Sequence, residues 1–153
     1  MRKMIEVLAI AAVVLIASGG PSLAGSKATI MVTASVMASI SQSVIHQESK
    51  ISITGEDLER GYVEIPSGTI LVVKTNDRSG YFLFFEGAND LFKEVWITDK
   101  GRTTVLSPNG GLIRQSHSGG NVEVKDLSYR LHLKENTQPG LYPWPFRVKA
   151  SLL

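Results

Sequence analysis

The chain has 153 residues, of which 43% are hydrophobic, 16 basic and 14 acidic, with a formal net charge of +2. A surface whose charges balance so closely lacks the electrostatic footprint of a protein that binds nucleic acid or an anionic membrane. The sequence contains no cysteine, so the fold relies on core packing and hydrogen bonding rather than on disulfides.

Residues 1–24 are predicted to be a secretory signal peptide. Two basic residues follow Met1, residues 7–17 are uninterruptedly apolar, and small residues precede the expected cleavage after Ala24. The apolar stretch is shorter than the roughly 20 residues that a membrane span requires. Removing this segment, with its two basic residues and one acidic residue, leaves a single domain of 129 residues and net charge +1. We expect this domain, residues 25–153, in a bacterial periplasm, on the cell surface or secreted, with no membrane span.

The segment from Ala28 to Ile40 alternates strictly between two kinds of side chain. One parity is apolar throughout: Ala28, Ile30, Val32, Ala34, Val36, Ala38 and Ile40. The other is mostly polar: Thr29, Met31, Thr33, Ser35, Met37 and Ser39. Because successive side chains of a strand point to opposite faces, the segment predicts a long amphipathic strand. Such a strand must be buried in a sheet, either of its own domain or of a neighbour.

Short apolar runs separated by turn signals fill the rest of the chain. Strands are expected at 50–54, 62–65, 69–75, 80–86, 91–98, 103–106, 112–115, 121–134 and 141–152, with one helical turn at 56–60. The run 80–86 is apolar on both parities, which favours a central strand covered on both faces. Asn109-Gly110 predicts a hairpin between 103–106 and 112–115. Eight to ten strands without a long helix predict an all-β, antiparallel, two-sheet immunoglobulin-like sandwich.

No residue cluster predicts catalysis or metal binding, and we expect neither an enzyme nor a cofactor. His46, His117 and His132 lie far apart without metal-ligand spacing, and Ser116 and Ser118 flank His117 without a third group to orient the base. The acidic residues at 56–59 lack the alternation of a calcium loop.

Most of the aromatic residues fall on strand faces that we assign to the core, Trp96 among them. Tyr142 and Trp144 are the exception that we consider, because Pro143 and Pro145 mark their segment as a sheet edge. A sugar-stacking platform there is the alternative to two partly covered anchors.

Two segments together resemble a known family. Ala28 to Ile40 looks like the opening strand of spore-coat-U-type and archaic chaperone–usher pilin domains. Pro139 to Leu152 looks like their closing strand, which follows a Pro/Ala-Gly-x-Tyr turn. Members often carry a cysteine soon after the first strand, where this chain has Ser41 and Ser43.

The resemblance implies an incomplete immunoglobulin-like sandwich that lacks one strand. A periplasmic chaperone and then the N-terminal strand of the next subunit would fill the groove by β-augmentation, giving a head-to-tail filament after usher-assisted assembly. The side chains inserted into the groove would be Ile30, Val32, Ala34, Val36 and Ala38. The alternative is a self-complete periplasmic or secreted module that binds carbohydrate or protein and whose first strand pairs in its own sheet.

Overall fold

A computed structural model describes residues 31–87 and 90–153. The predicted signal peptide and Ile30 lie outside these residues. The chain divides into two units, Met1–Ser35 and Val36–Leu153. In the first unit, residues 31–35 have no secondary structure and their side chains are exposed.

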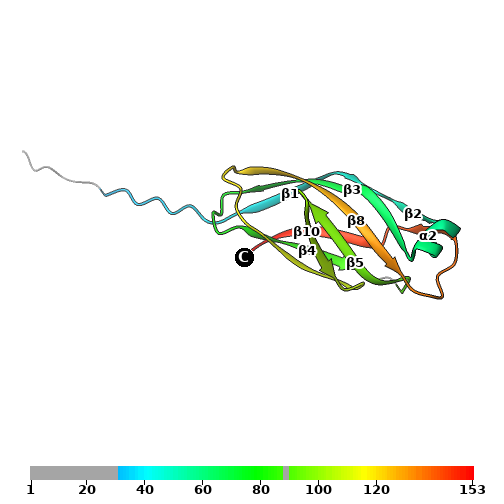
Figure 1. Cartoon of the computed structure of the whole chain (residues 1–153). Helices are drawn as coiled ribbons and strands as arrows, with labels where there is room; N and C mark the ends of the chain where they lie inside the picture. The colour runs from blue at the N-terminus through cyan, green and yellow to red at the C-terminus, as the bar shows by residue number, and fades with distance from the viewer. Residues whose placement is uncertain (1–30, 88–89) are drawn as a thin grey trace, which may run out of the picture. The chain divides into compact units, whose positions relative to one another are not determined.

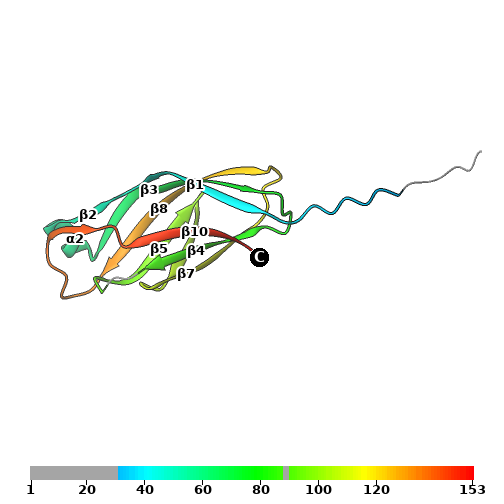
Figure 2. The ribbon, with the colours of Figure 1, turned by 180° about the vertical axis from the view of Figure 1, so that it is seen from behind.

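Ten strands of the described chain form three antiparallel sheets (Figures 1 and 2). The five-stranded sheet has the order β1 (Ile40–Gln47), β3 (Tyr62–Thr75), β8 (Val122–Leu133), β5 (Phe92–Asp99) and β6 (Arg102–Leu106). The three-stranded sheet has the order β10 (Phe146–Leu152), β4 (Tyr81–Gly87) and β7 (Gly110–Gln115). A two-stranded sheet joins β2 (Lys50–Ile53) to β9 (Gly140–Pro143). The all-β antiparallel prediction is confirmed, with three sheets in place of the two expected.

One hydrophobic core receives side chains from all three sheets. Its deepest members, each 0% exposed, are Leu71, Leu83, Phe92, Val95 and Leu131. β10 adds Phe146 and Val148, and β2 adds Ile51 and Ile53. Alternate residues of each long strand supply the core, as the pleat of a half-buried strand requires.

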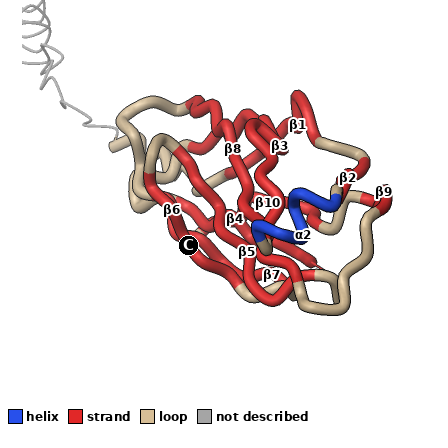
Figure 3. The backbone as a smooth tube through the Cα atoms, turned by 45° about the vertical axis from the view of Figure 1, so that its right-hand side comes forward, coloured by secondary structure: helices blue, strands red, loops and turns tan. Residues whose placement is uncertain are grey.

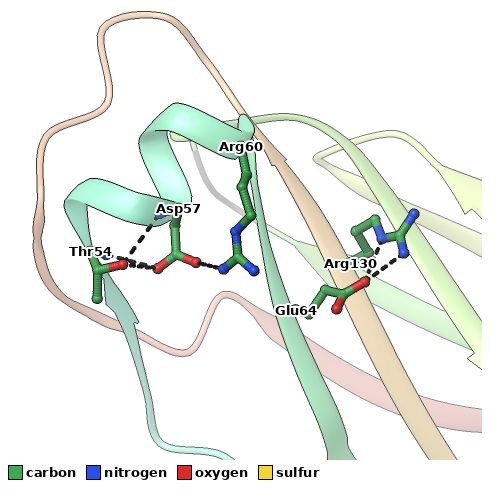
Figure 4. Close-up of polar contacts among 5 residues, drawn as sticks. All are labelled: Thr54, Asp57, Arg60, Glu64 and Arg130. Atoms are coloured by element: carbon green, nitrogen blue, oxygen red, sulfur yellow. Dashed lines mark hydrogen bonds and ion pairs between the residues drawn. The ribbon is translucent and has the colours of Figure 1, made fainter.

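A six-residue helix, α2 (Gly55–Arg60), lies near β2 and β9 (Figure 3). Thr54 and Asp57 form a capping box: Asp57 N donates to Thr54 Oγ1 at 3.3 Å, and Thr54 N donates to Asp57 Oδ2 at 2.9 Å (Figure 4). Arg60 donates to the other carboxylate oxygen. Burial opposes ionisation of Asp57, but these hydrogen bonds from Thr54 and Arg60 prevail and hold its pKa below the usual value. The described chain contains no helix with the length and apolarity that crossing a membrane requires.

The predicted hairpin around Asn109-Gly110 is wrong. β6 pairs with β5 and β7 pairs with β4, so the turn carries the chain from one sheet to another, with a single bridge between Ser107 and Gly110. Gly110 has φ 101°, and a Cβ there would lie 1.9 Å from the carbonyl oxygen of Phe85. The glycine therefore permits close passage over β4, a requirement that the dipeptide alone does not distinguish from a hairpin turn.

Two other expectations about side-chain faces need correction. Trp96 is only partly buried, because it lies on the parity of β5 opposite to Val95 and Ile97. β4 is the central strand of its sheet, yet Phe84 is 37% exposed, so one face of this strand is incompletely covered.

Candidate functional site

The apolar ribbon, residues 31–39, belongs to no strand of the structure. Its side chains are exposed on both parities, including Val32 at 85% and Met37 at 84%. A strand from Ala28 to Ile40 was expected; residues 28–30 lie outside the described residues, and within residues 31–87 the first strand begins at Ile40. A strand needs a neighbouring strand as its hydrogen-bonding partner, and residues 31–39 pair with no strand that the structure describes. The hydrophobic core of the structure therefore includes none of Val32, Ala34, Val36 and Ala38.

Asn76 fixes the end of the ribbon that joins β1. Ser39 N donates to Asn76 Oδ1 at 2.7 Å, and Asn76 Nδ2 donates to Met37 O at 2.9 Å. Thr75 Oγ1 also donates to Ser39 O at 3.0 Å. The chain is therefore held to the end of β3 from Met37 onward.

β10 presents an open edge. Within residues 31–87 and 90–153, its ladder runs to β4 alone, from Phe146↔Gly87 to Leu152↔Tyr81. Both backbone polar groups of a residue in an antiparallel strand point to the same side, and the side alternates along the strand. Phe146, Val148 and Ala150 direct theirs away from β4, as their contacts with β1 show.

Two glutamines of β1 reach this edge. Gln42 Nε2 donates to Val148 O at 2.9 Å, and Ala150 N donates to Gln42 Oε1. Gln47 Nε2 donates to Phe146 O at 2.6 Å. β1 and β10 run side by side in Figure 2, joined here through side chains in place of a backbone ladder.

An edge strand of this kind can accept another strand. Backbone groups that bond side chains can exchange these bonds for the continuous ladder of an added strand. The inward side chains of β10 already belong to the core, with Phe146 2% and Val148 5% exposed. A strand added at the edge of β10 would therefore lie along the border of that core.

Trp144 and Tyr142 are both partly buried. The Trp144 ring meets Tyr129 edge-on at a centroid distance of 5.0 Å and Phe146 at 6.1 Å. A Cβ on Gly68 would lie 2.9 Å from this indole, so the glycine makes room for it. Tyr142 Oη donates to Gln138 O at 2.8 Å.

The histidines stay apart. His46 lies 3.5 Å from the carboxylate of Glu48, and His132 packs near the rings of Tyr62 and Trp96 at 5.8 and 4.9 Å. The described residues contain no group of three or more side chains suited to hold a metal.

Sequence reasoning missed a charged network beneath a second pair of sheet edges. Lys125 is 3% exposed, and its Nζ donates to Asp99 Oδ2 at 2.8 Å and Gln115 Oε1 at 2.7 Å. It also lies 2.9 Å from Glu123 Oε1. The available signal was parity, because Lys125 continues the apolar series of Leu127 and the later inward residues of β8.

Glu123 is the centre of this network. Lys100 Nζ donates to Oε1 at 2.9 Å, and Tyr81 Oη donates to Oε2 at 2.8 Å. Burial disfavours the Glu123 carboxylate, but hydrogen bonds from Lys100, Lys125 and Tyr81 outweigh burial and lower its pKa. Burial and the acceptor Glu123 both raise the pKa of Tyr81, so its phenol stays neutral.

A cavity of about 370 Å³ lies on the other face of the five-stranded sheet, between β3, β8 and β5. Arg130 stacks over Tyr62 at 4.8 Å and over Trp96 at 5.5 Å from their ring centroids. Its Nε donates to Glu64 Oε1 at 2.9 Å (Figure 4). Arg130 already has a carboxylate and two aromatic rings as partners, so this cavity offers a ligand no unpaired cation at that position.

Comparison with known proteins finds no matching protein-family model, no matching curated protein and no matching solved structure.

Proposed function

We propose that the protein is an exported structural or adhesive subunit that assembles like a pilin, by exchange of its N-terminal strand. The ribbon of one copy would add to the edge of β10 in the next copy. The proposal rests on two features that occur together in the same chain. Residues 31–39 form an alternating apolar segment without a sheet, and β10 has an edge held by the side chains of Gln42 and Gln47.

The physical basis is strand addition. An incoming strand gains backbone hydrogen bonds with Phe146, Val148 and Ala150 and places every second side chain toward the core. Val32, Ala34 and Val36 would take these inward positions, together with Ile30 and Ala38. Their small and β-branched side chains suit a narrow site between β1 and β10.

The proposal includes a head-to-tail arrangement of an immunoglobulin-like sandwich completed by the neighbouring copy. Such a contact does not close on itself and gives a filament. Before assembly, a periplasmic chaperone and an usher would cover the edge of β10. The self-complete binding module is the second candidate, but its strand pairing is not supported by the exposure of residues 31–39.

Charge substitutions on the two faces of the ribbon test the proposal in the mature chain. Val32→Asp with Val36→Asp places charges on the inserting face, and Met31→Asp with Met37→Asp places them on the opposite face as a matched control. We expect the wild type and the control to form concentration-dependent polymers in light scattering and electron microscopy, and the first variant to stay monomeric. Equal assembly of both variants, or a wild type that remains a monomer with its ribbon unprotected in hydrogen exchange, would overturn the proposal.

A further inference from the structure

A second site lies at the opposite lateral edge of the sheets from β1 and β10. A cavity of about 440 Å³ opens between β6 and β7, the edge strands of the five-stranded and three-stranded sheets. This volume falls within the range of pockets that hold small molecules. Its floor contains the core residues Leu83, Ile97 and Leu127, which are at most 2% exposed.

Basic side chains outnumber acidic ones in the lining. Lys100, Arg102, Arg114 and Lys125 contribute four positive charges against the single carboxylate of Asp99. Lys125 is already bonded to Asp99 and Gln115, and Lys100 to Glu123. The two arginines are therefore the cations that remain available to a ligand.

Arg102 on β6 and Arg114 on β7 stand on the two strands that border the cavity. Both are exposed, and neither forms an ion pair with any residue that the structure describes. A guanidinium presents a planar fork of donors that matches a carboxylate. Two such groups on the border of a cavity with an apolar floor favour an anionic ligand.

Neutral polar groups complete the lining. Thr104, Gln115 and Ser116 supply hydroxyl and amide groups. Hydroxyl groups of a ligand can bond to these atoms, while its carbon skeleton rests on the apolar floor. A simple inorganic anion uses only the arginines and leaves the rest of the lining without a role.

We propose that this cavity binds an acidic sugar residue, whose carboxylate pairs with Arg102 and Arg114 and whose hydroxyls bond to the neutral polar groups. The site is independent of strand exchange, because it involves neither the ribbon nor β10. It gives the protein a ligand-binding function in addition to the proposed assembly.

The test titrates the mature protein with a trisaccharide of galacturonic acid and follows binding by calorimetry and by NMR shifts of β6 and β7 amides. The corresponding galactose trisaccharide and sodium sulfate serve as comparison ligands. We expect saturable binding of the acidic trisaccharide and a loss of at least about tenfold in affinity in Arg102→Gln/Arg114→Gln, as expected for the loss of charge-assisted bonds. Arg147→Gln, an exposed arginine on β10, is the matched control and should bind as the wild type does.

Three results would overturn the assignment. These are no binding of the acidic trisaccharide, equal binding of the neutral trisaccharide, and sulfate binding that is as tight and equally dependent on the two arginines. Circular dichroism confirms that the variants fold. Light scattering of the wild type keeps the two proposals apart. A wild type that forms polymers but does not bind the acidic trisaccharide contradicts the site alone, and a wild type that binds the trisaccharide but forms no polymers contradicts the assembly alone.

Discussion

Gln42 Nε2 lies 2.9 Å from the carbonyl oxygen of Val148, and the Gln42 carbonyl accepts a hydrogen bond from Ala150 N. One carboxamide thus makes, toward β10, the donor and acceptor contacts that a peptide group of a neighbouring strand would make. The edges of β1 and β10 are held together by this side chain and by Gln47. A strand that adds to β10 must displace both glutamines.

Gln42→Ala is expected to weaken the isolated subunit and accelerate its assembly. The substitution removes two hydrogen bonds to backbone groups of β10, at a cost of about 1 kcal/mol each in the free energy of unfolding. It also frees Val148 O and Ala150 N for an incoming strand. Urea denaturation measures the first effect and time-resolved light scattering the second. Ser43→Ala, exposed and next in the same strand, is the control, and an assembly rate equal in both variants contradicts the role assigned to Gln42.

Lys125→Met is expected to lower the free energy of unfolding by about 3–5 kcal/mol, because it leaves the largely buried carboxylate of Asp99 without its cation and leaves Glu123 with Lys100 alone. Lys149→Met removes a lysine whose ion pair with Glu86 is exposed, and it should cost at most about 1 kcal/mol. Urea denaturation at neutral pH compares the two. Losses of similar size in both variants would show that burial of the Lys125 network contributes little to stability.

The stability of the fold should decline in acid, with Glu123 and Asp57 responsible for part of the decline. Each has a pKa lowered in the folded protein, so the unfolded chain binds protons more readily as the pH falls. Their contribution is complete above the unfolded pKa values of about 4 and is lost as the pH falls through the lower folded values. Unfolding free energies measured between pH 7 and pH 2 should fall less steeply in Glu123→Gln. A slope in Glu123→Gln equal to that of the wild type would contradict the role assigned to Glu123.

Most of the fold could be predicted from the alternation of inward and outward side chains along the strands. The alternation of Leu127, Tyr129, Leu131 and Leu133 marks the inward face of β8, and all four are buried. The same parity extended backward reaches Lys125, where a cation on an apolar face is the sign of a buried ion pair. Two partners of Lys125, Asp99 on β5 and Gln115 on β7, come from other strands, so their identity depends on tertiary packing.

Other features required information that local pattern does not contain. Residues 31–39 alternate as a strand does, but alternation describes what a segment can bury and not where a partner lies. Gln42 looks like any other polar strand residue in the sequence. Its contact with Val148 arises because β1 and β10 belong to different sheets and lie next to each other. The candidate edge was therefore visible in the structure alone.

Gly110→Ala tests the crossing between β6 and β7. The residue combines φ 101° with a hypothetical Cβ 1.9 Å from Phe85 O, whereas Gly101 has φ 79° and nothing within 4 Å. Gly101→Ala therefore isolates the cost of a left-handed backbone, about 1–2 kcal/mol. Gly110→Ala should cost about 1–3 kcal/mol more, because the clash forces β7 away from β4. Urea denaturation of the two variants gives the difference, and equal losses would mean that the chain crosses β4 less closely than the contact with Phe85 implies.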